Sequence, residues 1–256
     1  MPRQGVATCT RPDSDIATKL GSMALSRSVS YLRIRGFYID DLYGDRAVRD
    51  SVTSSIARND PALFFGVGHG KEDLFTGQNQ QVIFRVCEPP ETIRGRVVYL
   101  LSCLTGAQLG VDMVNKGAET FIGYREEFVW VQERMVNPLD DRIGRAFFEP
   151  VEQIIRSLAD GRTTGDAYRA SIDRWNYWID YWSRQGTPEA SVVVMFLVHD
   201  RDCQVLYGST TAVVAPAYAP APPPLPLAVA EALTALTPFI IPVAGIGIAA
   251  TRGTRT

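Results

Sequence analysis

Two short runs in this chain of 256 residues end on side chains that carry out nucleophilic and acid–base chemistry. The run PALFFGVGHG (61–70) contains His69, and the run VVYLLSCLTG (97–106) contains Cys103. A thiol with a reference pKa of about 8.5 is only a few per cent thiolate at neutral pH, so it needs a base to become an effective nucleophile. Because an imidazole can take that proton and later return it, a cysteine and a histidine in one cleft predict a hydrolase of the cysteine type.

The stretches before both side chains indicate neighbouring strands of one parallel sheet. Residues 63–67 and 97–101 are apolar without alternation of polar and apolar positions, which is typical of strands buried on both faces. Functional sites of such sheets lie at the carboxyl ends of the strands, and neighbouring strands are about 5 Å apart. We therefore expect His69 and Cys103 to leave two strand ends toward the same cleft.

Glycines around the histidine predict a close approach of the backbone at this site. Gly66, Gly68 and Gly70 have no Cβ, so the chain can turn tightly there and lie against a ligand. The amide N–H groups of Gly70 and Cys103 are expected to form an oxyanion hole. One such donor typically lowers the barrier by about 2.7–4 kcal/mol.

The motifs of three other classes of enzyme can be compared with the residues around Cys103. A cysteine phosphatase needs an arginine six residues after the nucleophile, where this chain has Leu109, and the sequence has no GxSxG motif of a serine hydrolase. A glutamine amidotransferase also places its cysteine at a strand–helix elbow and uses a histidine far downstream, as in CLTGAQ (103–108) followed by His199. The spacing after the cysteine is one residue longer than in that pattern, but this alternative stays open.

Alternating strands and helices surround the two runs. Strands are predicted at 5–10, 37–43, 63–67, 97–101, 120–124 and 204–207. Helices are predicted at 15–35, 45–59 and 106–115, the stretch 138–185 is helical and rich in Trp and Tyr, and 191–198 is apolar. Asp13 or Ser14 is expected to cap the first helix. The alternation predicts an α/β fold in which a parallel sheet is covered by helices on both faces.

The composition argues against several classes of function. A formal net charge of −2, with no basic stripe in the sequence, argues against a nucleic-acid partner. The four cysteines form no CxxC pair, so neither a zinc ribbon nor a disulfide scaffold is predicted, and no metal or cofactor is expected. The first residues lack the apolar core of a secretory signal, so we expect a cytoplasmic protein with reduced thiols.

The C-terminal part differs in character from the rest. A peptidase-sized domain is expected at 1–211, followed by a Pro/Ala-rich linker at 212–226 and a hydrophobic segment at 227–256. Residues 232–250 carry no charge, and this length is close to the ~20 residues that span a bilayer. The segment 227–250 is therefore predicted to anchor the chain to a membrane, with packing against the domain as the alternative.

Several motifs resemble those of the caspase-like cysteine peptidases, a superfamily that includes caspases, legumains, clostripain, separase and the gingipains. The motifs are LYGDRAVRDSV (42–52), GVGHG (66–70) with LFTGQ (74–78), LLSCLTGAQLG (100–110), GAETFIGY (117–124) and FLVHDRDCQVLYGS (196–209). The sequence looks most like the gingipain-type branch found in bacteria and archaea. The resemblance covers about residues 5–210.

The resemblance implies a three-layer α/β/α fold with a mostly parallel central sheet of about six strands. By the same resemblance, His69 is the general acid and base, and Cys103 is the nucleophile that forms a thioester acyl-enzyme on a peptide or protein substrate. The amides of Gly70 and Cys103 would bind the oxyanion, and the dyad of the family needs no third, acidic member. Glu126 and Glu127 are candidates for a pocket that binds a basic substrate residue. A non-catalytic adaptor or sensor with this fold is the alternative.

Overall fold

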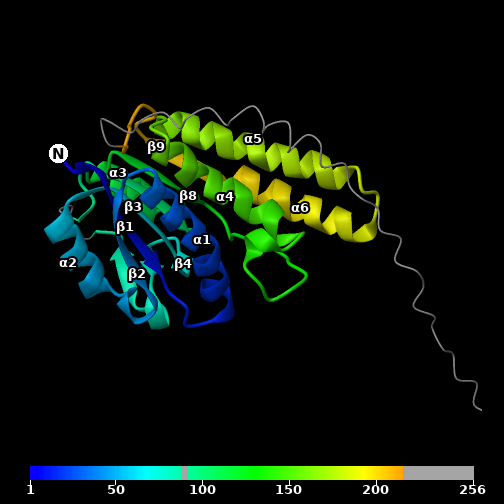
Figure 1. Ribbon diagram of the computed structural model, residues 1–256, viewed down its shortest axis with the longest axis horizontal. Coiled ribbons are helices and arrows are strands. Elements are labelled where there is room, and N and C mark those ends of the chain that lie inside the picture. The colour runs from blue at the N-terminus through cyan, green and yellow to red at the C-terminus, as the bar shows by residue number, and fades with distance from the viewer. Residues whose placement is uncertain (88–91, 216–256) are drawn as a thin grey trace, which may run out of the picture. The chain divides into compact units, whose positions relative to one another are not determined.

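A computed structural model describes residues 1–87 and 92–215 of the chain, and its centre is a six-stranded sheet in the order β2-β1-β3-β7-β8-β9 (Figure 1). The strands are β1 (Arg3–Arg11), β2 (Tyr38–Tyr43), β3 (Pro61–Val67), β7 (Val97–Leu101), β8 (Thr120–Tyr124) and β9 (Gln204–Gly208). The five strands from β2 to β8 run parallel, and β9 closes one edge antiparallel to β8. This sheet confirms the mostly parallel arrangement of about six strands that the sequence predicts.

Helices cover both faces of the sheet (Figure 1). They are α1 (Ile16–Ile34), α2 (Arg49–Asn59), α3 (Leu109–Asn115), α4 (Gly144–Ala159), α5 (Thr164–Ser183) and α6 (Pro188–Cys203). Residues of α1, α4, α5 and α6 share one buried cluster with the sheet, whereas residues of α2 and α3 share a second cluster with its opposite face. The expected three-layer α/β/α fold is therefore confirmed.

The central strands are apolar throughout because both of their faces are covered. Every residue of β3, β7 and β8 is buried. Phe65 packs into the cluster that contains α1 and α4, whereas the adjacent Phe64 packs into the cluster that contains α2 and α3. Since successive side chains of a strand point to opposite faces, a doubly covered strand requires apolar residues at every position.

A small second sheet follows β3 and was not predicted from the sequence. It consists of the antiparallel strands β4 (Gly70–Lys71), β5 (Leu74–Thr76) and β6 (Val82–Arg85). The ring centroids of Phe64 and Phe84 are 5.0 Å apart, and those of Phe75 and Phe84 are 6.3 Å apart, so this sheet packs on the face that carries α2 and α3. Strands of two to four residues are too short to show a periodic pattern.

The aromatic-rich stretch consists of two helices, α4 and α5, rather than one continuous helical region. Trp175 and Trp182 of α5 are fully buried, whereas Tyr177 and Tyr181 of the same helix are exposed. The two tryptophans therefore pack into the core, and the two tyrosines lie at the surface. The apolar segment 191–198 is the central part of α6.

The chain after β9 packs against the domain as far as it is described. Gly5 N–H donates to Val214 O at 2.8 Å, and Val214 and Ala215 are buried. Residues 212–215, which the sequence analysis placed in the linker, therefore belong to the packed body. The rest of the predicted linker and the segment 227–256 lie outside the described residues, so the membrane association and the cytoplasmic location stay predictions. Among the described residues, no helix is long and apolar enough to cross a bilayer.

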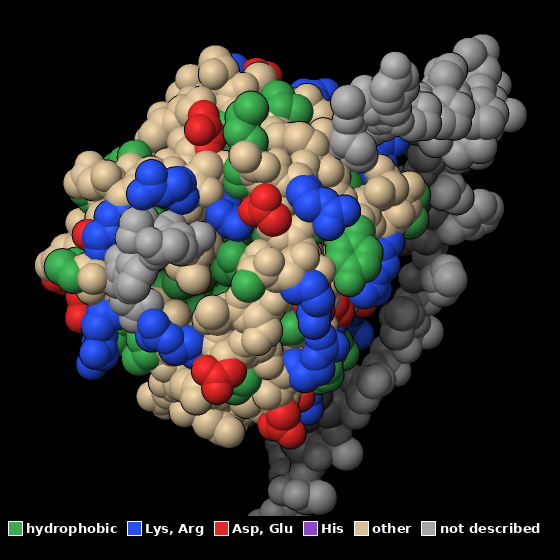
Figure 2. All heavy atoms as spheres, turned by 90° about the vertical axis from the view of Figure 1, so that its left-hand side faces the viewer, with side chains coloured by type: hydrophobic (Ala, Val, Ile, Leu, Met, Phe, Trp, Pro, Cys, Tyr) green, Lys and Arg blue, Asp and Glu red, His purple; other side chains and the backbone are tan. Residues whose placement is uncertain are grey.

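Charged side chains of both signs are spread over the face that Figure 2 shows, where Lys and Arg lie among Asp and Glu. Such mixing is also present around β2 and α2, where Asp40 forms salt bridges with Arg46 at 2.8 Å and with Arg58 at 3.0 Å. Both arginine side chains are exposed, so these pairs contribute on the order of 0–1 kcal/mol each.

The connection between β8 and α4 is held by one buried carboxylate, that of Asp141. Its oxygens accept hydrogen bonds from the backbone N–H groups of Glu133, Arg134, Ile143 and Gly144, over distances of 2.8–3.2 Å. Burial raises the pKa of Asp141, but these backbone hydrogen bonds outweigh it and hold the pKa below its ordinary value. The ionised side chain therefore organises a long connection that has little regular structure of its own.

Replacing this carboxylate should destabilise the protein in a pH-dependent way. We expect Asp141→Asn to lower the free energy of unfolding at pH 7 by about 1.5–3 kcal/mol, since hydrogen bonds to a charged group are lost. Because the folded pKa is depressed, the contribution is complete above the unfolded pKa of about 3.9 and disappears as the pH falls through the folded pKa. Urea unfolding at pH 7 and at pH 3 measures both effects. The control is Asp140→Asn, whose side chain is 56% exposed; an equal loss in that variant would contradict the assignment.

Candidate active site

The register of β3 and β7 brings the two predicted side chains to the same level of the sheet. Val67 lies opposite Leu101 at the last pair of the two strands, and His69 and Cys103 each follow that pair by two residues. The Gly68 N–H donates to Leu101 O at 3.4 Å, so the pairing of the two chains extends one residue beyond the end of β3. Both side chains line one cavity of about 220 Å³. The structure therefore brings His69 and Cys103 together, as the sequence predicts.

Gly70 is the residue at which the loops after β3 and β7 touch. A Cβ atom at this position would lie 2.2 Å from Cys103 O, 2.3 Å from Ser102 Oγ and 2.8 Å from Thr105 Cγ2. Real Cβ atoms do not approach other atoms this closely, so a larger residue would push the two loops apart. The glycine after the histidine is thus required by the contact with the backbone of the cysteine.

The Gly70 amide is turned away from the neighbouring strand β5. Gly70 pairs with Phe75, and the flanking hydrogen bond runs from Thr76 N–H to His69 O at 2.9 Å. In an antiparallel ladder this pattern makes Gly70 and Phe75 a pair without mutual hydrogen bonds, whose N–H and C=O groups point outward. The Gly70 N–H is therefore available to a ligand on the side of the loop away from β5.

The backbone directly after Cys103 has an unusual conformation. Leu104 has φ = +62°, in the left-handed region that costs a residue with a side chain about 1–2 kcal/mol. Hydrogen bonds from Leu104 N–H to Glu126 O at 2.9 Å and from Gly106 N–H to Tyr124 O at 2.8 Å hold this turn against the end of β8. The strained residue lies next to the thiol, a place where such strain is often functional.

The Cys103 thiol is half-buried and rests in its protonated form. Burial raises its pKa above the ordinary value, the contact of Sγ with Phe128 O at 4.0 Å lowers it, and the charges of Glu127 and Asp200 raise it. The net shift is upward, so the free thiol carries little thiolate at neutral pH. A base is therefore needed to activate it.

The His69 ring is held by a carboxylate that the sequence analysis missed, that of Asp15. His69 Nε2 and Asp15 Oδ2 are 2.9 Å apart. This contact occupies Nε2, so Nδ1 is the ring nitrogen left for proton exchange. The dyad thus has an acidic neighbour, which the family resemblance did not lead us to expect.

Asp15 is also the cap of α1, so the expected cap at Asp13 or Ser14 is wrong by one or two positions. The Asp15 side chain accepts from Thr18 N–H at 2.9 Å, and Thr18 Oγ1 accepts from Asp15 N–H at 3.3 Å, which is a capping box. Burial raises the pKa of Asp15, but the bonds from Thr18 and His69 lower it further than burial raises it. The D-x-x-T spacing before a helical pattern was the signal in the sequence that identifies this cap.

The structure does not place Glu126 and Glu127 with the other site residues. Both side chains are exposed, and neither is among the described residues that line the cavity. Glu126 Oε2 lies 3.9 Å from His199 Nδ1, and Glu127 O accepts a hydrogen bond from His199 Nε2 at 2.8 Å. What the segment 126–130 contributes to the cavity is instead the aromatic pair Phe128 and Trp130.

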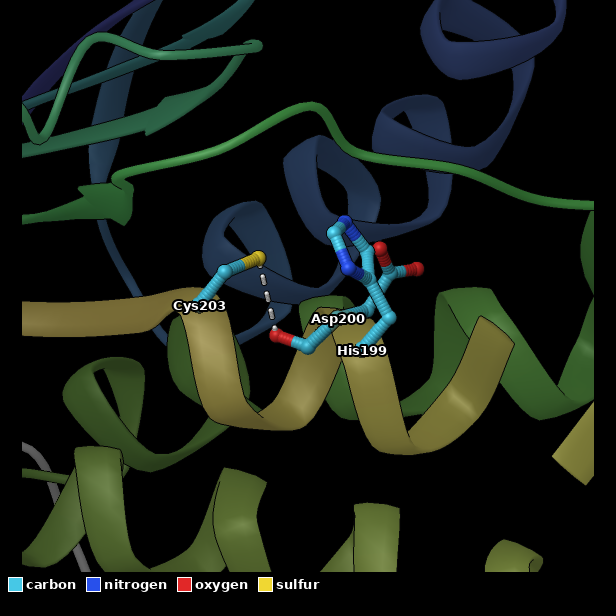
Figure 3. Close-up of side chains that lie close together, drawn as sticks. All are labelled: His199, Asp200 and Cys203. Atoms are coloured by element: carbon cyan, nitrogen blue, oxygen red, sulfur yellow. Dashed lines mark hydrogen bonds between the residues drawn. The ribbon is translucent and has the colours of Figure 1, made fainter. Parts of the chain in front are cut away.

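His199, Asp200 and Cys203 form a cluster at the end of α6, with ligand-type atoms that all lie within 4.8 Å of one another (Figure 3). Asp200 Oδ1 accepts from Val129 N–H at 3.0 Å, and the Cys203 thiol donates to Asp200 O at 3.4 Å. Burial raises the pKa of Cys203 to about 12, with a further upward contribution from Asp200, and burial also raises the pKa of Asp200 well above its usual range. Cys203 therefore remains a thiol at neutral pH. With His199 bound to Glu127 O, the cluster fastens α6 to the segment that lines the cavity.

Comparisons with known proteins identify the fold of this chain. No protein-family model and no curated protein matches it. A crystal structure of the Arg-specific cysteine proteinase gingipain R aligns with a TM-score of 0.54 at 12% identity, over 82% of this chain and 48% of that one. A complex of the pro- and mature domains of RgpB from Porphyromonas gingivalis aligns with a TM-score of 0.56 at 11% identity, over 85% and 50%. The chain has the caspase-like fold of these proteins and spans about half their length; a bacterial or archaeal branch stays a prediction.

The effect of the Asp15 carboxylate on His69 can be separated by mutation from its role as the cap of α1. Asn caps a helix as well as Asp does, so Asp15→Asn should change the free energy of unfolding by less than about 0.5 kcal/mol. It removes the charge beside His69, and we expect kcat/KM for a cleaved peptide to fall roughly 10-fold to 100-fold. Ser14→Ala, a change at the neighbouring exposed residue, is the control. Equal activity of Asp15→Asn and the unchanged protein would show that the contact is only structural.

Proposed function

We propose that this protein is a cysteine endopeptidase in which His69 and Cys103 form the catalytic dyad. The observation that carries the proposal is their joint position on one cavity, at the ends of two adjacent parallel strands. The similarity of the fold to a cysteine proteinase supports the same class of reaction, although the identity is low. The substrate would be a peptide or a protein, because a thiol nucleophile beside an imidazole suits the cleavage of an amide bond.

The reaction begins with attack of Cys103 Sγ on the carbonyl carbon of the scissile amide. The thiol proton moves to His69 Nδ1, and Asp15 stabilises the imidazolium that forms. The N–H groups of Gly70 and Cys103 donate hydrogen bonds to the carbonyl oxygen and stabilise the negative charge that develops on it. The imidazolium then gives its proton to the leaving nitrogen, and the C–N bond breaks to leave a thioester. Water, losing a proton to His69, hydrolyses the thioester and regenerates the Cys103 thiol.

A non-catalytic adaptor with the same fold is the second candidate function. The half-burial and raised pKa of the Cys103 thiol favour it, because both reduce the reactivity of the free protein. The amidotransferase alternative has less support, since His199 donates to Glu127 O and is not among the described residues that line the cavity. It predicts that His199→Ala abolishes activity while His69→Ala does not, which is the reverse of our proposal.

Loss of the nucleophile should abolish peptide cleavage without unfolding the protein. We expect Cys103→Ala to reduce kcat/KM by at least about 1000-fold, measured with a fluorogenic peptide library. Cys87→Ala is the matched control because Cys87 is exposed and is not among the described residues that line the cavity, so the activity of this variant should stay within twofold. Unchanged cleavage by Cys103→Ala would contradict the proposal.

Two cysteine reagents distinguish an enzyme from an adaptor. Iodoacetamide should modify the exposed Cys87 before Cys103, because the pKa of the half-buried Cys103 is raised. A peptidyl acyloxymethyl ketone should instead modify Cys103 first, since peptide binding delivers the reactive carbon to the thiol beside His69. Mass spectrometry of tryptic peptides shows which cysteine each reagent modifies first. If the ketone also modified Cys87 first, the adaptor function would be favoured.

A further inference from the structure

The cavity that adjoins Cys103 has a definite chemical character. It has a volume of about 220 Å³, and it reaches from the ends of β3 and β7 to α1 on one side and α4 on another. We infer that this cavity is the pocket for the P1 residue, the residue whose carbonyl is attacked, and that it selects a bulky apolar side chain. This inference rests on the proposed function and names its substrate class.

The position of the cavity identifies it with the P1 side chain. The nucleophile attacks the carbonyl carbon of P1, and the P1 side chain leaves the Cα atom directly bonded to that carbon. Leu101, Ser102 and Cys103 all line the cavity, so the cavity adjoins the residue that carries the thiol. A peptide bound for attack therefore brings its P1 side chain within reach of this cavity.

The walls of the cavity are mostly apolar. Phe128 and Trp130 come from the connection after β8 and Phe148 comes from α4. The ring centroids of Phe148 lie 5.9 Å from those of Phe128 and 5.6 Å from those of Trp130, and both pairs are in edge-to-face contact. Val67 and Leu101 complete the apolar lining at the strand ends. An aromatic or aliphatic side chain would exchange water for these surfaces, which is favourable.

Helix α1 leaves room in the cavity because two of the residues that it contributes to the lining are small. Ala17 and Gly21 line the cavity, and they lie four residues apart on one face of the helix. A Cβ atom at Gly21 would lie 2.6 Å from Val67 Cγ2, so the helix already approaches the end of β3 as closely as it can. The glycine therefore permits this close approach within a helix, where glycine is otherwise unfavourable.

The ionisable groups that line the cavity, among the described residues, are His69 and Cys103. Glu126 and Glu127 lie outside the lining, and the Asp15 carboxylate is occupied by His69. An Arg or Lys side chain would therefore find no carboxylate among the described lining residues, and an Asp or Glu side chain would find only His69, which Asp15 already holds. Burial of an unpaired charge is strongly unfavourable, so the pocket discriminates against all four residues.

The size of the cavity suits a ring or a branched chain. An apolar cavity of roughly 150 Å³ binds benzene. The cavity here is larger, about 220 Å³, so a phenyl ring or a Leu or Met side chain fits. An Ala side chain would leave most of the space unfilled. Since one methylene in a hydrophobic pocket changes kcat/KM by roughly 10-fold or more, a preference for Phe or Leu over Ala of at least about 10-fold is expected.

A series of peptides that differ only at P1 tests the inference on the full chain. Fluorogenic amides with Phe, Leu, Ala, Arg or Asp at P1 are compared by kcat/KM. We expect Phe or Leu to exceed Ala by at least about 10-fold, and Arg and Asp to fall below Ala. The inference is overturned if Arg or Asp is the best residue, or if Phe, Leu and Ala are cleaved equally. If Arg were the best P1 residue, Glu126 and Glu127 would again be candidates for the residues that bind the P1 side chain.

A designed change of specificity gives a second, independent measurement. Ala17→Asp places a carboxylate on the cavity wall in the first turn of α1, where the helix dipole favours negative charge. We expect the ratio of kcat/KM for Arg over Phe to rise at least about 10-fold, whereas the uncharged variant Ala17→Asn should raise it by less than threefold. If the ratio were unchanged in both variants, the cavity would not hold P1.

Covalent probes separate failure of this inference from failure of the proposed function. Acyloxymethyl ketones with Phe or Arg at P1 are incubated with the protein, and modification of Cys103 is followed by mass spectrometry. Faster modification by the Phe probe supports the pocket, and faster modification by the Arg probe refutes it while leaving the peptidase intact. If neither probe modifies Cys103 and no peptide is cleaved, the proposed function and this inference both fail.

Discussion

The parallel pairing of β3 with β7 is the constraint on which the candidate site depends. Because Val67 and Leu101 are opposite each other at the ends of the strands, two residues more on each chain bring His69 and Cys103 to one level. A shift of the register by one residue would send one of these side chains to the other face of the sheet. The register is secured by burial, since every residue of both strands is buried and all but Pro61 and Gly66 lie in one of two apolar clusters. The core thus fixes the geometry of the site.

The close approach of the loops after β3 and β7 requires a strained backbone conformation, and burial of the central strands offsets its free-energy cost. The absence of a Cβ at Gly70 lets the loops touch, and Leu104 takes up the left-handed conformation that turns the chain after the thiol. That conformation persists because β8 and the segment after it bind the turn through backbone hydrogen bonds. Strain of about 1–2 kcal/mol is small beside the burial of three doubly covered strands.

The central sheet and the layer that contains α1 and α4 form the surroundings of His69 and Cys103. The N-terminus of α1 supplies Asp15 to the imidazole, and the following turn of the same helix forms one wall of the cavity. The segment after β8 supplies the aromatic wall, and it is fastened at both ends by buried carboxyl groups. Asp200 accepts from the Val129 amide at one end, and Asp141 accepts from four amides at the other. A loop with little regular structure can form a defined wall only because such contacts restrain it.

The sequence by itself determined the fold class, the central strands and the placement of His69 and Cys103 beyond two neighbouring strand ends. These follow from local properties: apolar runs without alternation require a doubly covered sheet, and His69 and Cys103 follow two such runs directly. Asp15, the aromatic cavity and the exclusion of Glu126 and Glu127 from its lining were decided only by the tertiary structure. Asp15 and His69 are separated by 54 residues, and their contact depends on where the end of α1 packs over the sheet. The same holds for Phe128 and Phe148, which belong to different elements. Contacts of this kind have no periodic signature, since they arise from the packing of elements against one another.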